Sequence, residues 1–142
     1  MTEKVLLVDD EEDFLNIMSD RMKSRGIDVS TATSAKEAIQ LTETKSFDVI
    51  ILDLQMPEMN GLEALKALKA RKPELQVILL TGHATLERGI EAMKLGAMDL
   101  MEKPVDLRIL IEKIKKAQGK KMIMVEKQAE EKTKFLIGEK GW

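Results

Sequence analysis

The feature that most constrains the fold is the regular alternation of short apolar runs with segments of helical periodicity. The strand-like runs cover residues 5–8, 28–31, 49–52, 76–80 and 98–101. A segment with helical spacing follows each run, over residues 13–24, 34–44, 61–70, 85–95 and from about 105 onward. Because parallel strands are joined by right-handed helical crossovers, this order predicts an α/β protein with a three-layer, doubly wound parallel sheet of five strands.

The composition of the runs indicates where each strand lies. Residues 5–8 and 49–52 are continuously apolar, as expected of central strands covered on both faces. Residues 28–31 are poor in apolar side chains, so we expect this strand near an edge. Ser34 followed three residues later by Glu37 predicts a capping box at the start of the second helix.

The bulk composition excludes several classes of protein. A chain of 142 residues suits one domain with a full hydrophobic core. Charged residues make up 34% of the chain, yet the net charge is only -2, without the basic excess of a nucleic-acid-binding module. The absence of cysteine excludes disulfides, thiolate metal sites and a catalytic thiol. No signal peptide and no apolar run of membrane length are present, so a cytoplasmic protein is expected.

Polar residues follow the predicted strands at the points where the strands end. Asp9 and Asp10 follow the first run, Asp53 follows the third, Thr81 the fourth and Lys103 the fifth. The carboxyl ends of parallel strands share one edge of a sheet, and ligands bind at that edge. Each residue alone is more often a turn former or helix cap, but together they predict a functional site. A carboxylate delivered there is a metal ligand or a nucleophile.

Four motifs in this order carry a resemblance to a known family. They are Val8-Asp9-Asp10-Glu11-Glu12, Leu52-Asp53-Leu54-Gln55-Met56-Pro57-Glu58-Met59-Asn60-Gly61, Leu80-Thr81-Gly82-His83-Ala84 and Glu102-Lys103-Pro104. With these motifs, residues 3–118 closely resemble the receiver domain of bacterial two-component response regulators, the CheY-like family. The resemblance implies a flavodoxin-like sheet with strand order 2-1-3-4-5.

The resemblance also implies a magnesium site. Asp10 and Asp53 would coordinate Mg²⁺ directly, together with the backbone carbonyl of Gln55. Asp9 would act through a metal-bound water. Three carboxylates crowded together repel one another, and a hard divalent cation relieves that repulsion.

The same motifs imply a phosphoacceptor role. Asp53 would accept a phosphoryl group and form an aspartyl phosphate, while Lys103 pairs with one phosphoryl oxygen and the hydroxyl of Thr81 with another. The chain would then catalyse only its own phosphorylation and dephosphorylation and would not be a turnover enzyme. The Lys103–Pro104 peptide is commonly cis in the family.

Three further positions concern regulation. Gln55 and His83 match family positions that tune the lifetime of the acyl phosphate, although an exposed loop histidine is an equally good interpretation of His83. Leu100 stands where the family usually carries an aromatic side chain, and the chain contains no tyrosine. The usual aromatic readout of phosphorylation is therefore in doubt.

The end of the chain differs from the rest. We expect residues 1–118 to form the receiver domain and residues 119–142 to form a charged helical extension. A loosely heptad apolar pattern, interrupted by Lys132, is compatible with a partner-binding helix, and a solvated helix or frayed tail is an equally good interpretation. The residues of this pattern are Met122, Val125, Ala129, Lys132 and Leu136.

The expected partners follow from the family. They are a sensor histidine kinase or a histidine phosphotransfer protein, an unknown downstream protein target and a second copy in a phosphorylation-dependent dimer. Neither direct nucleic-acid binding nor membrane association is expected. Alternatives are a phosphorelay intermediate and the N-terminal receiver fragment of a transcriptional regulator. A pseudo-receiver that binds partners without phosphorylation is disfavoured, because every residue of the expected acceptor site is present.

Overall fold

The computed structural model describes residues 2–54, 56, 61–82 and 86–138. Strands and helices alternate along the chain, as the sequence predicts. The strands are β1 (Lys4–Val8), β2 (Asp28–Ala32), β3 (Val49–Asp53), β4 (Gln76–Thr81) and β5 (Asp99–Glu102). The helices are α1 (Glu12–Lys23), α2 (Ala35–Thr44), α3 (Gly61–Arg71), α4 (Leu86–Lys94) and α5 (Leu107–Gly138).

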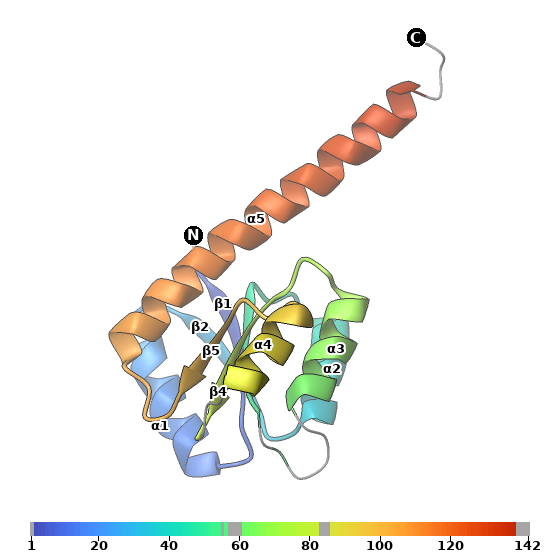
Figure 1. Ribbon diagram of the computed structural model, residues 1–142. Coiled ribbons are helices and arrows are strands. Elements are labelled where there is room, and N and C mark those ends of the chain that lie inside the picture. The colour runs from blue at the N-terminus through green and yellow to red at the C-terminus, as the bar shows by residue number, and fades with distance from the viewer. Residues whose placement is uncertain (1, 55, 57–60, 83–85, 139–142) are drawn as a thin grey trace.

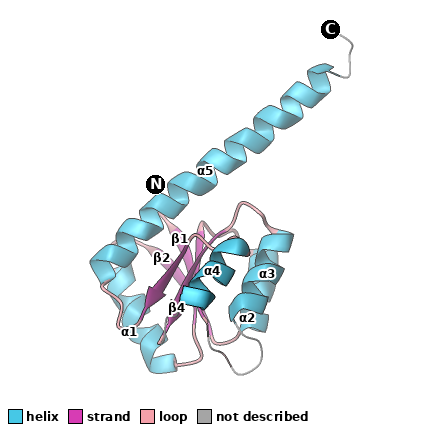
Figure 2. Ribbon diagram, in the orientation of Figure 1, coloured by secondary structure: helices cyan, strands magenta, loops and turns pink. Residues whose placement is uncertain are grey.

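All neighbouring strands pair in parallel, in the order β2-β1-β3-β4-β5. The predicted fold class and strand order are therefore confirmed. The apolar β3 is the central strand, with every residue buried, and the polar β2 lies at an edge. Figure 2 shows the strands between two layers of helices.

Successive side chains of each strand point to opposite faces of the sheet, and this creates two hydrophobic cores. On one face, Leu6, Ile50 and Leu79 pack with the apolar residues of α2, α3 and α4. On the other face, Leu7 and Ile51 pack with those of α1 and α5. Because successive side chains in a strand point to opposite faces, a continuous apolar run supplies both cores at once. The strand ends then emerge from a rigid layer.

The start of α2 differs from the predicted capping box in one bond. The hydroxyl of Ser34 accepts the backbone N–H of Glu37 at 3.1 Å, as predicted. The carboxylate of Glu37, however, accepts the N–H of Thr33 at 3.2 Å and the hydroxyl of Thr33 at 3.1 Å. A side chain long enough to reach back one turn also reaches the preceding residue, whose hydroxyl offers a second donor. Ser34 is therefore the N-cap as predicted, while the bond to the Glu37 carboxylate comes from Thr33, one residue before it.

Helix α5 runs without interruption through Gly119, and its 32 residues span about 48 Å at 1.5 Å per residue. Leu110, Ile114 and Ala117 bury its first half against the sheet. The second half projects past the sheet (Figure 1), and residues 125–136 are exposed. The domain boundary at residue 118 stays a prediction. None of the helices in the described ranges is both long and apolar enough to cross a membrane.

A polar clamp holds α5 where it leaves the domain. The carboxylate of Asp48 accepts the N–H of Lys4 at 2.9 Å, Nε2 of Gln118 at 3.2 Å and Nζ of Lys121 at 3.3 Å. Lys121 also donates to the carbonyl of Phe47 at 2.9 Å. The side chains of Asp48 and Lys121 are each only 17% exposed, which reduces the screening of their ion pair by solvent. One carboxylate thus joins the starts of β1 and β3 to α5.

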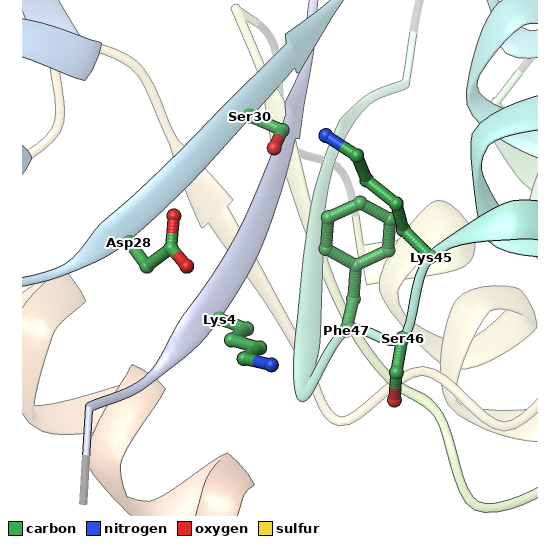
Figure 3. A pocket seen from close by; sticks show the side chains of 6 residues that line it. All are labelled: Lys4, Asp28, Ser30, Lys45, Ser46 and Phe47. Atoms are coloured by element: carbon green, nitrogen blue, oxygen red, sulfur yellow. The ribbon is translucent and has the colours of Figure 1, made fainter.

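A small hollow of about 290 Å³ lies near this clamp, where β1 and β2 begin (Figure 3). It is lined by Lys4, Asp28, Ser30, Lys45, Ser46 and Phe47. Lys4 and Asp28 are the first residues of their strands, so the hollow lies at the amino ends of the sheet. The polar residues predicted to form the site all follow the carboxyl ends, so this hollow is separate from that site.

Gly61 begins α3 because the backbone approaches β3 too closely for a side chain. A Cβ at this position would lie 2.5 Å from the Cα of Leu54 and 2.9 Å from the carbonyl oxygen of Asp53. The N–H of Gly61 donates to the carbonyl of Leu54 at 2.7 Å, which holds the two segments together. The sequence predicts a helix from residue 61 onward, and this close approach is the reason why it begins with glycine.

We expect Gly61→Ala to lower the free energy of unfolding by about 1–3 kcal/mol, because backbone atoms have to move. Gly119→Ala is the matched control. Its Cβ meets nothing within 4 Å inside a helix, so this change should stabilise the protein by about 0.5–1 kcal/mol. Urea unfolding measures both values. Equal effects of the two substitutions would contradict the packing explanation for Gly61.

Candidate functional site

Three carboxylates meet at the carboxyl edge of the sheet. Asp9 and Asp10 directly follow β1, and Asp53 is the last residue of the neighbouring β3. One oxygen from each carboxylate lies within 4.8 Å of the others. Asp9 is 1% and Asp53 6% exposed, while Asp10 faces solvent. The cluster is therefore buried on one side and accessible on the other.

Three hydrogen bonds fix the position of Asp9. Its N–H donates to the carbonyl of Ala32 at 3.1 Å, which ties the end of β1 to the end of β2. Its Oδ1 accepts the N–H of Glu11 at 2.9 Å, which turns the chain toward α1. Its Oδ2 accepts a hydrogen bond from Nζ of Lys103 at 2.6 Å. Both oxygens of a nearly inaccessible carboxylate are thereby satisfied, as burial requires.

Lys103 brings a positive charge to the cluster from β5. Its Nζ lies 3.9 Å from Oδ2 of Asp53 and 4.4 Å from the centre of the Phe14 ring. Its backbone N–H donates to the carbonyl of Thr81 at 2.8 Å, and its peptide bond to Pro104 is cis. The ammonium therefore touches two carboxylates and one aromatic face.

The surroundings of Lys103 keep it charged. Partial burial alone would lower the pKa of its ammonium. The hydrogen bond to Asp9 and the negative charge of Asp53 outweigh burial and raise the pKa above its ordinary value. A raised pKa contributes stability below the unfolded pKa, and that contribution is lost as the pH rises through the folded value. The loss falls in the alkaline range above 10.5, so Lys103 is a cation at neutral pH.

Thr81 completes the group at the same edge. It is the last residue of β4 and is fully buried. Asp53 pairs with Leu80, so Thr81 lies one residue beyond the partner of Asp53. The N–H of Leu54 also donates to the carbonyl of Leu80, at 2.7 Å. The structure thus brings Thr81 to the edge that carries the three carboxylates and Lys103. Gln55 and His83 lie outside the described residues.

Phe14 is the member of the site that sequence reasoning missed. In the sequence it is one of several apolar residues at helical spacing along α1, and it does pack against the core on that face. No motif distinguishes a core phenylalanine from one whose ring also receives a cation. Only the fold, which places the start of α1 and the residue after β5 at the same edge of the sheet, brings Phe14 to Lys103.

The donor set of the cluster suits a hard divalent cation. Carboxylate oxygens are the ligands that Mg²⁺ prefers, and Mg²⁺ is usually held by one or two carboxylates together with water and phosphate. Asp9, Asp10 and Asp53 supply three negative charges within 4.8 Å, which Lys103 offsets only in part. The exposure of Asp10 leaves the cluster an open side toward solvent.

Leu100 lies away from the cluster, against α4. It packs on the core, and its Cδ2 lies 3.7 Å from where a Cβ of Gly89 would be. With the exposed apolar residues of α4 it lines an open cavity of about 740 Å³. The lining residues are Leu86, Gly89, Ile90, Met93, Lys94, Asp99 and Leu100. Leu100, at the position where the family usually carries an aromatic residue, is thus an aliphatic side chain beside α4.

Comparison with known proteins defines the class of this chain. The family model described as the response regulator receiver domain matches residues 5–115. A receiver domain from Clostridium thermocellum superposes with a TM-score of 0.81 at 36% identity, covering 86% of this chain and 98% of that one. The NtrC4 receiver domain dimer, solved in its beryllofluoride-activated form, gives a TM-score of 0.78 at 32% identity, covering 83% and 98%. The chain belongs to the response regulator receiver domain family, whose members generally bind Mg²⁺ at an acidic pocket.

Curated relatives are much longer proteins. An NtrX-like response regulator from Rickettsia bellii is 39% identical over 115 residues, which is 80% of this chain and 24% of that protein. The transcriptional regulatory protein ZraR of Escherichia coli K12 is 33% identical over 113 residues, 80% of this chain and 26% of that protein. The chain therefore spans about a quarter of the length of these relatives and corresponds to their receiver part.

The acidic cluster predicts opposite effects of one substitution on stability and on metal binding. Asp10→Ala removes one of three repelling carboxylates, so without divalent cations we expect the free energy of unfolding to rise by up to about 1 kcal/mol. The affinity for Mg²⁺ should fall at least tenfold, as measured by calorimetry. Glu12→Ala, on the first turn of α1, is the control and should change neither value much. Unchanged Mg²⁺ affinity in Asp10→Ala would contradict a metal site at this cluster.

Proposed function

We propose that Asp53 accepts a phosphoryl group from the phosphohistidine of a sensor histidine kinase or of a histidine phosphotransfer protein, in a Mg²⁺-dependent reaction. One observation carries this proposal. The carboxylate of Asp53 ends the central strand with two more carboxylates within 4.8 Å and an ammonium at 3.9 Å. A buried nucleophile surrounded by cation-binding groups is suited to attack an anionic phosphoryl group.

Asp10 and Asp53 are proposed as direct metal ligands together with the backbone carbonyl of Gln55, with Asp9 acting through water. A bound Mg²⁺ supplies the positive charge that lets an anionic carboxylate approach a phosphoryl group. The residues themselves do the positioning. The N–H of Asp9 bonds to Ala32 at the end of β2, and its carboxylate accepts the N–H of Glu11, so the acidic loop is held against the sheet. The geometry of the site thus depends on the sheet more than on side-chain freedom.

The transfer forms a bond between a carboxylate oxygen of Asp53 and phosphorus. The bond between phosphorus and the donor imidazole nitrogen breaks, and the electron pair stays with that nitrogen, which takes up a proton. In this proposal Lys103 binds one phosphoryl oxygen as a point charge and Thr81 donates its hydroxyl to another. The chain acts on itself only, in both phosphorylation and hydrolysis, in keeping with a signalling family. Gln55 and His83 remain proposed determinants of the acyl-phosphate lifetime.

The relatives support a role in a longer regulator. Because ZraR is a transcriptional regulatory protein, we propose that this receiver controls a downstream protein or domain and does not itself bind DNA. The setting would be the cytoplasm, where a kinase can reach it. Transfer onward in a phosphorelay uses the same chemistry and remains an alternative.

The proposed output follows two backbone connections at the site. Thr81 precedes the segment that leads to α4, and Lys103 precedes α5. Leu100 has neither a ring to rotate nor a hydroxyl, so it would at most fill space vacated beside α4. We therefore propose that phosphorylation shifts the backbone after Thr81 and after Lys103. These shifts would reposition α4 and α5, and α5 would carry the change along its projecting half. Phosphorylation has to favour one arrangement over another for this to occur.

Replacing the acceptor tests the chemistry. With acetyl phosphate and Mg²⁺, the wild-type protein should gain the mass of one phosphoryl group, and Asp53→Asn should gain none, because an amide oxygen is a poor nucleophile. Asp13→Asn, in the first turn of α1, is the matched control and should be labelled like the wild type. Intact-protein mass spectrometry under mild conditions measures this. Stoichiometric labelling of Asp53→Asn would refute the assignment.

Truncation tests the proposed phosphorylation-dependent dimer. Removing residues 125–142 leaves the contacts of Lys121 and the Met124–Gln76 contact intact, so the melting temperature should change by no more than about 2 °C. Labelling of Asp53 should persist, while self-association of the phosphorylated protein should weaken, as measured by sedimentation velocity. Removal of residues 139–142 alone is the control. Undiminished self-association after the longer truncation would show that the projecting helix has no part in it.

A further inference from the structure

We propose that Phe14 is the positioning residue for Lys103: its ring holds the ammonium at the acceptor site when the carboxylate of Asp9 is engaged by a divalent cation. The inference rests on the proposed function, because it concerns the residue that is to bind the phosphoryl group. It starts from the distance of 4.4 Å between Nζ of Lys103 and the centre of the Phe14 ring. This distance is well inside the range of about 6 Å over which a ring face attracts a cation.

Lys103 contacts carboxylates, which also attract a divalent cation, and an aromatic ring, which does not. Its shortest contact is with Oδ2 of Asp9 at 2.6 Å, and its distance to Oδ2 of Asp53 is 3.9 Å. Both carboxylates belong to the cluster that suits a hard cation. A divalent cation, bound directly by Asp53 and through a water by Asp9, therefore competes with the ammonium for these two carboxylates. The face of an aromatic ring is no ligand for a hard cation such as Mg²⁺, so the contact with Phe14 is not subject to that competition.

The location of Phe14 makes it a fixed support. It lies in the first turn of α1, directly after the acidic loop, and is partly buried against the core that α1 and α5 share. Lys103, in contrast, is a long side chain with four rotatable bonds, which has to lose rotamer freedom to serve the site. The side chain of Lys103 is only 18% exposed, so its contact with the ring is partly desolvated, and desolvation strengthens cation–π attraction.

The consequence is specific to the chemistry of the ring. An aliphatic residue at position 14 would preserve the packing on α1 but offer no negative face to the ammonium. Lys103 would then depend on the carboxylates alone. It would compete more strongly with Mg²⁺ for Asp9 and would be held less well for the phosphoryl oxygen. A tyrosine would keep the ring and should keep the function.

The test compares Phe14→Leu with Phe14→Tyr in the full chain. We expect Phe14→Leu to lower the rate of phosphorylation by acetyl phosphate about threefold to tenfold at saturating Mg²⁺, and to weaken Mg²⁺ binding about twofold to threefold in calorimetry. Phe14→Tyr should stay within about twofold of the wild type in both. NMR supplies a direct readout, since the ring should shift the Lys103 ε-methylene signal upfield. That shift should vanish in Phe14→Leu and persist in Phe14→Tyr, with Lys103→Arg assigning the signal.

Several outcomes would overturn the inference. They are a wild-type phosphorylation rate in Phe14→Leu, an unchanged Lys103 signal in that variant, and equal losses in Phe14→Leu and Phe14→Tyr. The last result would mean that only the shape of the side chain matters. Should the wild-type protein accept no phosphoryl group, the proposed function fails, and the Mg²⁺ titration and the NMR shift still decide whether Phe14 holds Lys103. A fall in melting temperature without change in those two readouts would reduce Phe14 to a packing residue.

Discussion

Crowding of like charges at one edge of the sheet is the constraint on which the rest of the site depends. Three carboxylates within 4.8 Å, two of them nearly inaccessible, are stable only if cations offset them and the backbone holds them. Lys103, which follows β5, offsets part of this negative charge. A divalent cation is proposed to offset the rest. The parallel sheet makes the arrangement possible, because β1, β3, β4 and β5 each bring a residue of the candidate site to the same edge. The same repulsion favours binding of a cation, and we propose that such a cation lets Asp53 accept a phosphoryl group.

Much of this arrangement could be predicted because it follows from local pattern. The apolar runs predict the strands, since a strand covered on both faces needs continuous hydrophobicity, and the order of strands and helices then brings the strand ends together. Contacts between segments distant in the chain were not predictable. The cation–π contact joins residues 14 and 103, and the Asp48 clamp joins residues 4, 48, 118 and 121. Gly61 shows the intermediate case: the pattern predicts that a helix begins there, but only the structure gives the close approach of the backbone as the reason for glycine.

The opposite ends of α5 have different physical roles. Its start follows Lys103 and Pro104, so it is connected to the site, while the Asp48 clamp fixes it at the amino edge of the sheet. Beyond that clamp the helix makes a projecting arm with exposed apolar residues, among them Met122, Val125 and Leu136. A displacement at the site would be transmitted along α5. The Asp48 clamp would oppose that movement where the helix leaves the domain.

Direct localisation of the phosphoryl group tests the central claim, that charge crowding at this edge makes Asp53 the acceptor. An acyl phosphate is reduced by borohydride to an alcohol, which converts an aspartyl phosphate to homoserine, and peptide sequencing by mass spectrometry then finds the modified position. After phosphorylation with Mg²⁺ present, the account predicts homoserine at position 53 and at neither Asp9 nor Asp10. Homoserine at either of those two positions, or labelling that resists reduction, would contradict it.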